Sequence, residues 1–203
     1  MPRENQRPLD THRLLTAVCE ADVAFVIVGG MAAVAQGSAY ITADLDICYQ
    51  RTPINFQRVS KALRPLHPRL RGAPPGLPFP LDESSIKAGL NFTLITDGGD
   101  VDLLGEISGL GFYETVKEQA EEMEVFGYRL WVLTIQGLIR SKEAAGLTIS
   151  HCASVVNCLV KTRDQKERMT TSVNSRMKTP HRVVLPDIAN RPYQKRLCPK
   201  SRG

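Results

Sequence analysis

Residues 42–47 read Thr-Ala-Asp-Leu-Asp-Ile, and this stretch decides the fold. Successive side chains of a β-strand point to opposite faces, so Asp44 and Asp46 share one face while Leu45 and Ile47 share the other. Two carboxylates held this close repel each other unless a cation lies between them. Hard divalent ions such as Mg²⁺ prefer oxygen ligands, commonly one or two carboxylates together with substrate phosphates. The stretch therefore predicts a strand that carries a metal and phosphate site.

A second acidic segment supplies a third carboxylate. Residues 97–100 read Asp-Gly-Gly-Asp, which is typical of a tight hairpin turn, because glycine accepts the positive φ angles that such turns require. With the two glycines as the loop, Ile95 lies opposite Asp102, and Asp102 falls on the polar face of the hairpin. We predict Asp102 as the third metal ligand and Asp100, which is nearer to the turn, as the alternative.

The glycine pair Gly29 and Gly30 ends the apolar run 25–28 and precedes a helix that we expect from Met31 onward. Because glycine has no Cβ, a triphosphate could approach the backbone here. The N-terminus of the following helix would offer N–H groups and the positive end of the helix dipole.

The remaining pattern predicts an α/β fold of the α+β type. We expect a mixed sheet of about four or five strands, with helices on one face and the acidic site on the other. Helices are predicted at 10–19, 55–66 and 115–124, the last with a solvated acidic face. The proline-rich loop 69–80 is either a rigid connector or a lid, in which Arg69 and Arg71 could meet phosphates and Phe79 could cover a base.

Composition divides the chain into two regions. Residues 1–146 carry a net charge of −4 and residues 147–203 a net charge of +9, so the overall +5 describes neither. We predict a domain at 1–146 and a basic tail at 147–203 that is mostly disordered or loosely docked. The tail is either a solvated terminus or a flexible guide for RNA.

Several protein classes are excluded by missing patterns. The five cysteines form an odd set without a C-x-x-C pair, which favours reduced thiols in a cytoplasm over a disulfide framework. The chain has neither a P-loop nor the G-x-G-x-x-G spacing of a dinucleotide site. Its apolar stretches are too short to cross a bilayer, and no secretion signal is recognisable, so we expect no membrane association.

These residues resemble the nucleotidyltransferase superfamily that includes DNA polymerase beta. Within it they are most similar to the small nucleotidyltransferases of toxin–antitoxin and abortive-infection systems. The resemblance covers about residues 10–146. The matching segments are 28–30, 37–38, 42–47, 101–103, 131–134 and 138–146.

The resemblance implies that the chain moves a nucleoside monophosphate from an NTP to a hydroxyl acceptor, with two Mg²⁺ or Mn²⁺ ions. Asp44 and Asp46 would bind both ions, and Asp102 would bind one and help the acceptor hydroxyl to lose its proton. The implied nucleotide-binding residues are Gly29, Gly30, Ser38 and Lys142. The acceptor would be an RNA end, a protein or a small molecule, and an antitoxin protein is an implied partner.

A second hypothesis is a catalytically idle binding module that keeps the fold and acts through a protein or RNA partner. Two departures from the family pattern favour it. The family often has a basic residue shortly before Thr42, where this chain reads Ala39-Tyr40-Ile41, and a basic and an acidic residue after Gly146, where it reads Leu147-Thr148. The complete set of three acids favours the enzyme.

Overall fold

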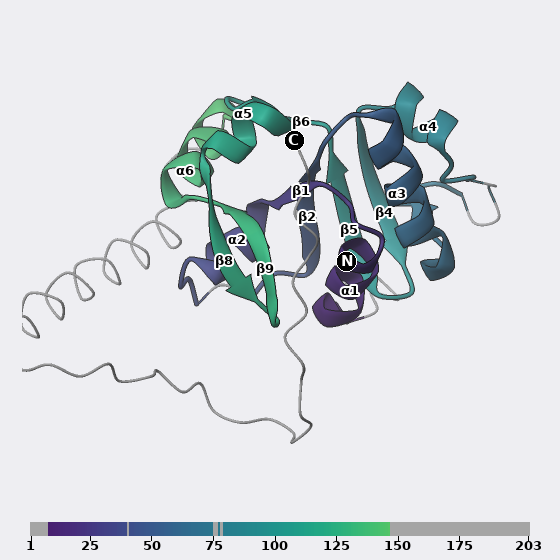
Figure 1. The fold of residues 1–203 in the computed structure, drawn as a ribbon, viewed down its shortest axis with the longest axis horizontal. Helices are drawn as coiled ribbons and strands as arrows, with labels where there is room; N and C mark the ends of the chain where they lie inside the picture. The colour runs from purple at the N-terminus through teal and green to yellow at the C-terminus, as the bar shows by residue number, and fades with distance from the viewer. Residues whose placement is uncertain (1–7, 40, 75–76, 78, 147–203) are drawn as a thin grey trace, which may run out of the picture.

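A mixed sheet with helices on both faces organises the part of the chain that the computed structural model describes (Figure 1). The described residues are 8–39, 41–74, 77 and 79–146. The predictions for the basic tail at 147–203, and with them the domain boundary at residue 146, lie outside the described residues.

The elements have the following bounds. The strands are β1 (Phe25–Ile27), β2 (Asp44–Tyr49), β3 (Arg69–Leu70), β4 (Asn91–Thr96), β5 (Gly99–Leu104), β6 (Glu106–Ile107), β7 (Gly111–Phe112), β8 (Ala120–Val125) and β9 (Tyr128–Leu133). The helices are α1 (Thr11–Glu20), α2 (Gly29–Ala35), α3 (Pro53–Leu63), the 3-10 turn η1 (Arg64–Leu66), α4 (Glu83–Ala88), α5 (Tyr113–Glu118) and α6 (Ile135–Ala144). None of the described helices is both long enough and apolar enough to cross a membrane.

The large sheet has seven strands in the order β3-β4-β5-β2-β1-β9-β8, while β6 and β7 form a separate pair. β2 runs parallel to β5 and β1 runs parallel to β9, whereas the other neighbours in this sheet are antiparallel. The α/β class and the mixed sheet are thus confirmed. The expected four or five strands are too few, because β3 and β8 fall in segments predicted as a loop and a helix.

The first helix forms as its sequence predicts. The Asp10 side chain caps it by accepting a hydrogen bond from the backbone N–H of Arg13 at 3.0 Å. Leu14, Leu15 and Val18 recur at helical spacing and are buried in the core. The predicted start at residue 10 or 11 is confirmed.

Helices cover both faces of the sheet, which corrects the prediction that they lie on one. The Tyr49 ring points to one face, where it meets Phe56 of α3 edge-on at 6.5 Å between centroids. Its neighbour Cys48 points to the other face, which it shares with Asp44 and Asp46. That face is covered near Cys48 by α5, because Gln50, two residues further along the chain, donates a hydrogen bond of 3.2 Å from Nε2 to Glu114 of α5, and Cys48 is fully buried.

The helix predicted at 115–124 ends early, which is a further correction. α5 stops at Glu118, and β8 then pairs with β9 in an antiparallel hairpin. The hairpin closes at Phe126 and Gly127, whose φ angles of 50° and 82° suit a two-residue turn of the type favoured between twisted strands. Pairing with an apolar neighbouring strand overrides the helical preference of the glutamate-rich segment.

The hairpin of β4 and β5 has a different register from the predicted one. Asp102 pairs with Thr93 and Asp100 pairs with Ile95, so the loop is formed by Asp97 and Gly98 rather than by the two glycines. The Thr96 hydroxyl fixes this turn by donating to the Gly99 carbonyl at 2.7 Å and accepting from the Gly98 N–H. The shift is two residues, so each side chain keeps its predicted face.

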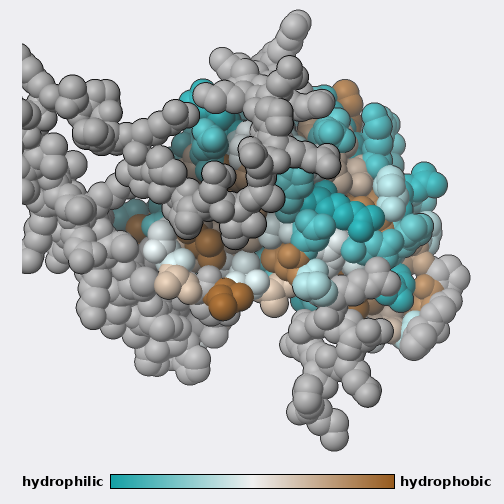
Figure 2. Space-filling model, turned by 90° about the horizontal axis from the view of Figure 1, so that it is seen from below, coloured by the Kyte–Doolittle hydropathy of each residue, from teal (hydrophilic) through white to brown (hydrophobic). Residues whose placement is uncertain are grey.

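On the face drawn in Figure 2, hydrophobic residues lie as separate spots among hydrophilic ones wherever the described surface is visible. Scattered apolar side chains of this kind are normal on a folded protein. The large hydrophobic side chains with the highest exposure are Ile41, Ile54 and Leu77.

Candidate metal centre

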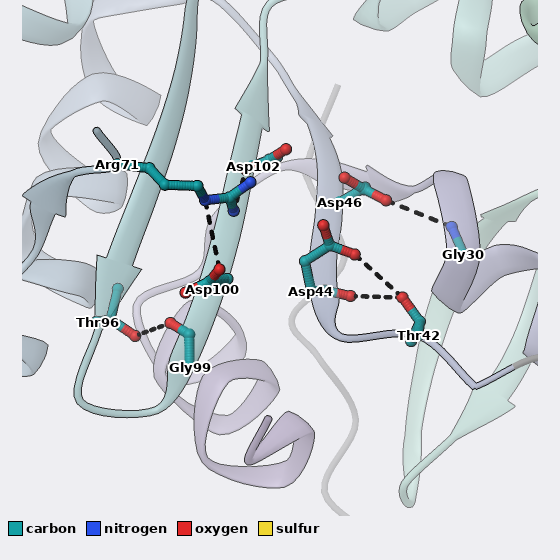
Figure 3. Close-up of polar contacts among 9 residues, drawn as sticks. All are labelled: Gly30, Thr42, Asp44, Asp46, Arg71, Thr96, Gly99, Asp100 and Asp102. Atoms are coloured by element: carbon teal, nitrogen blue, oxygen red, sulfur yellow. Dashed lines mark hydrogen bonds and ion pairs between the residues drawn. The ribbon is translucent and has the colours of Figure 1, made fainter. Parts of the chain in front are cut away.

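Three carboxylates converge at the centre of the sheet (Figure 3). Asp44 and Asp46 lie on β2, and Asp102 lies on the adjacent parallel strand β5, where it is the register partner of Asp46. One oxygen from each of the three groups lies within 4.8 Å of the others. The structure therefore brings together all three residues predicted as metal ligands, while their role in binding a metal stays a prediction.

The convergence follows from alternation along both strands. Leu45 and Ile47 of β2 and Leu103 of β5 are fully buried and face the core on the other side of the sheet. Because successive side chains of a strand alternate between its two faces, the aspartates next to these core residues lie on the opposite face. The apolar core thus fixes where the carboxylates lie.

Asp100 is a fourth carboxylate at this site. It is the register partner of Asp44 and lies on the same face of β5 as Asp102. Its residue is 9% exposed, which makes it a buried acid beside the three candidate ligands. It was predicted only as an alternative to Asp102, whereas the structure has both acids in the cluster.

A guanidinium group lies among these acids (Figure 3). The Arg71 Nη2 donates a hydrogen bond of 2.7 Å to Asp102 Oδ1. Its Nε lies 3.3 Å from Asp100 Oδ2, close enough for an ion pair, but this buried Nε has no hydrogen-bond partner in the structure. We take the contact as electrostatic attraction without a directed hydrogen bond. The sequence suggested that Arg71 could contact phosphates, and its contact with the acids was not predicted.

The cluster carries unbalanced negative charge. Burial, followed by repulsion from Asp44 and then Asp102, raises the pKa of Asp46 from 3.8 to about 6, although the Gly30 N–H and the Lys142 charge act in the opposite direction. Burial also raises the pKa of Asp102, even though Arg71 lowers it. Carboxylates that resist ionisation in this way are stabilised in their charged form by a cation.

The donor atoms suit a hard divalent cation. The three candidate ligands offer only carboxylate oxygen, which Mg²⁺ and Mn²⁺ prefer. Cys48 shares their face but is fully buried, and burial with the nearby Glu114 charge raises the pKa of its thiol to about 12. A thiol that stays protonated is a poor metal ligand, so Cys48 is a packing residue. It lies in the core of the domain.

Gly29 and Gly30 shape the space around Asp46. The Gly30 N–H donates a hydrogen bond of 3.3 Å to Asp46 Oδ2. Gly29 has a φ of +57°, and a Cβ at this position would overlap the same carboxylate oxygen. The pair therefore makes room for the acid, a role that sequence reasoning missed. The predicted contact of these glycines with a triphosphate stays a prediction.

The other predicted or supporting residues surround the acids. Ser38 is 7% exposed, and its N–H donates to the Ala33 carbonyl at 2.9 Å. Lys142 is an exposed residue of α6 whose charge acts on Asp46. Thr42, which sequence reasoning did not assign to the site, directs its hydroxyl toward Asp44, 3.1 Å from Oδ1. The Thr-x-Asp spacing was the available signal.

A separate hollow of about 660 Å³ lies between α3 and the start of α4. Several of its polar groups are hydrogen-bonded within the fold: Ser60 Oγ donates to the Leu81 carbonyl, and Gln57 Nε2 donates to Glu83. Asp82 caps α4 by accepting from the Ser85 N–H. Basic and acidic side chains line this hollow together, so it lacks the one-sided charge of the acidic cluster.

Comparisons with known proteins give little beyond the geometry. No family model matches the chain, and no curated protein matches it. Among solved structures, a candidate nucleotidyltransferase from Thermotoga maritima is similar, with 14% sequence identity and a TM-score of 0.47. The match covers 86% of this chain and 99% of that chain. The function is therefore inferred from the residues themselves.

Proposed function

We propose that this protein is a metal-dependent nucleotidyltransferase that transfers a nucleoside monophosphate from an NTP to a hydroxyl acceptor. The observation that carries the proposal is the cluster of three carboxylates, with one oxygen of each within 4.8 Å of the others. Carboxylates on neighbouring strands that hold cations next to a triphosphate provide the main requirement of phosphoryl-group transfer, which is charge neutralisation and alignment.

In this proposal Asp44, Asp46 and Asp102 bind Mg²⁺ or Mn²⁺. The bound ion would neutralise phosphate charge and make an acceptor hydroxyl easier to deprotonate. The chain itself contributes fixed positions: the Gly30 N–H holds the Asp46 carboxylate, and the Thr42 hydroxyl lies within hydrogen-bond distance of both the backbone carbonyl and the carboxylate of Asp44. Because these contacts are present before substrate binds, little reorganisation is needed in the reaction.

The proposed nucleotide contacts are Gly29, Gly30, Ser38 and Lys142. Lys142 has the best support, because its charge already acts on Asp46 and could equally act on a phosphate bound beside that acid. Gly30 has one N–H, which Asp46 accepts in the present arrangement. A phosphate contact at Gly30 would therefore need that hydrogen bond to be shared or exchanged.

For the acceptor we propose an RNA end, a protein hydroxyl or a small-molecule hydroxyl. We further propose that the protein acts as the toxin of a toxin–antitoxin pair, with the antitoxin as its protein partner. This part rests on the resemblance of the motif segments to small nucleotidyltransferases of that type. Growth arrest on expression, abolished by Asp44→Asn/Asp46→Asn, is the expected result for a toxin.

One observation favours a second candidate, a catalytically idle binding module. The Arg71 guanidinium is hydrogen-bonded to Asp102, the acid proposed to assist the acceptor hydroxyl. A permanent ion pair at this position would leave only Asp44 and Asp46 of the three proposed metal ligands. The protein would then keep the fold and act through a protein or RNA partner.

Labelled NTPs separate the two candidates. The full-length protein is incubated with each α-labelled NTP and with Mg²⁺ or Mn²⁺, in the presence of total tRNA or cell extract, and transfer of label is measured. The enzyme predicts transfer that Asp44→Asn/Asp46→Asn abolishes. Glu20→Gln, which removes an exposed carboxylate at the end of α1, is the matched control and should retain transfer.

Two outcomes would count against the enzyme. Label transfer that persists in the double variant would refute the roles of Asp44 and Asp46. If no NTP is transferred and none binds in a metal-dependent way, the idle binding module is the better account. Melting curves of each variant establish that a lost activity does not come from unfolding.

A further inference from the structure

The acidic cluster contains its own cation in the form of Arg71. We propose that Arg71 is the internal counter-ion of this site, and that a divalent cation can use Asp102 only after the guanidinium has left it. Metal binding and the Arg71–Asp102 pair are then mutually exclusive. This inference deepens the proposed function but concerns cation binding, which is measured separately.

The backbone of Arg71 is fixed while its side chain reaches across the sheet. The residue follows β3, and its N–H donates to the Thr93 carbonyl of β4 at 2.8 Å. Thr93 is in turn the register partner of Asp102 on β5. The guanidinium therefore reaches the acids of β5 across the intervening strand β4. Rotation of the side chain alone is enough to release Asp102.

The contact is strong at one end and poor at the other. The hydrogen bond to Asp102 Oδ1 is short, at 2.7 Å, as expected for two charged partners. The buried Nε has no hydrogen-bond partner, although Asp100 Oδ2 lies 3.3 Å away. A buried donor without an acceptor is costly, so the pair with the acids is less favourable than a two-pronged contact would be. This makes exchange for another partner feasible.

Charge balance favours the exchange. The guanidinium contacts two carboxylates, those of Asp100 and Asp102, and the carboxylates of Asp44 and Asp46 lie close to that of Asp102. Lys142 adds an exposed positive charge on α6. The single charge of Arg71 offsets only part of this negative charge. A divalent ion bound directly to carboxylate oxygens offsets more of it.

The released guanidinium would need a new partner, and the proposed function supplies one. Arginine binds phosphate oxygens with two parallel hydrogen bonds, which is a better use of its donors than the present contact. The phosphates of an NTP bound at the ions would lie beside Arg71. A cation and an NTP should then strengthen each other's binding.

Manganese binding without nucleotide tests the competition. Free Mn²⁺ is followed by electron paramagnetic resonance during titration of the full-length protein. Arg71→Gln should bind Mn²⁺ about tenfold more tightly than the unmodified protein, since the competing hydrogen bond between charged groups is gone. Arg64→Gln, which removes an exposed arginine from η1, is the control and should leave the affinity unchanged. Unchanged or weaker binding by Arg71→Gln would overturn the proposal.

A double-mutant cycle distinguishes direct competition from a general change of charge. In an Asp102→Asn background the contested oxygen is no longer a carboxylate, so Arg71→Gln should tighten Mn²⁺ binding much less than it does alone. An equal effect in both backgrounds would show that Arg71 acts only through its charge and would overturn the proposal. If Arg71→Gln fails to fold, Arg71→Lys replaces it. Lysine lacks the planar fork, so tighter Mn²⁺ binding is again expected, and its absence is the contrary result.

A titration with a non-hydrolysable NTP analogue relates the inference to the proposed function. In the unmodified protein the analogue should tighten Mn²⁺ binding, and this coupling should fall at least severalfold in Arg71→Gln because the guanidinium no longer links the two ligands. If the analogue does not bind, the nucleotidyltransferase proposal fails while the competition at Asp102 stands. If the analogue tightens Mn²⁺ binding by the same factor in both proteins, the released Arg71 guanidinium does not bind the phosphates.

Discussion

Replacing Asp46 with asparagine should stabilise the protein against unfolding in the absence of metal. The carboxylate lies half-buried between Asp44 and Asp102, and its pKa is raised from 3.8 to about 6. Asparagine has nearly the same shape and no charge. Its side-chain oxygen can still accept from the Gly30 N–H, and its amide group can donate to a neighbouring carboxylate.

The magnitude follows from the pKa. The increase from 3.8 to about 6 corresponds to about 3 kcal/mol of unfavourable free energy for the charged form in the folded protein. Because the folded-state pKa is above the unfolded one, the folded protein binds more protons between these values. Its stability therefore falls as pH rises from about 4 to about 6, and the full penalty is present above that range.

The expected gain of Asp46→Asn is thus close to zero near pH 4 and as much as about 3 kcal/mol at pH 7.5. In a protein of this size, this gain would raise the melting temperature by roughly 6 to 12 °C. Urea unfolding is followed by circular dichroism at both pH values, with EDTA present so that no divalent ion offsets the repulsion. Glu20→Gln removes an exposed carboxylate outside the cluster and should change stability by less than about 0.5 kcal/mol.

Two results would contradict this reasoning. Lower stability of Asp46→Asn at pH 7.5 would mean that the carboxylate is held by favourable contacts that outweigh burial and repulsion. A gain of equal size at pH 4 and pH 7.5 would mean that the substitution acts through packing rather than through charge.

Two further predictions concern Asp46 and its neighbour Gly29. Gly29→Ala should lower the free energy of unfolding by at least about 1 kcal/mol and weaken Mn²⁺ binding, because φ is +57° and the new Cβ would overlap Asp46. Urea unfolding and Mn²⁺ titration measure the two effects, and unchanged Mn²⁺ affinity in this variant would show that the glycine does not position the acid. Mn²⁺ affinity of the unmodified protein should fall by up to tenfold for each pH unit below about 6, since protons and metal compete for the Asp46 carboxylate. The same Mn²⁺ affinity at pH 5 and pH 7 would show that ionised Asp46 is not a ligand.

The local alternation of side chains could be predicted from the sequence. The pattern around Asp44 and Asp46 fixes which residues face the core, and the structure confirms it because buried leucine and isoleucine residues enforce it. The hairpin that carries Asp102 has another register than predicted, yet the acid kept its face because the shift was even. The cluster could be located from the alternation of side chains along each strand, because a register error of two residues leaves every side chain on the same face.

Features that depend on distant partners could not be predicted in this way. The strand Ala120–Val125 exists because Tyr128–Leu133 pairs with it, while its own glutamates indicate a helix. Arg71 reaches Asp102 only because a short edge strand places the two close together. The cluster of acids was therefore predictable, and its counter-ion was not.

The rigidity of the core explains why the acids remain so close together. Leu45, Ile47 and Leu103 are fully buried on the far face, so β2 and β5 cannot slide or separate to relieve repulsion without exposing apolar surface. Two other responses are open to the site. One is for Asp46 to retain its proton more strongly, as its raised pKa indicates, and the other is for Asp102 to bind a cationic side chain, as it does with Arg71. Because both responses end when a divalent ion binds the same oxygens, the repulsion built into the strands is itself a source of cation affinity.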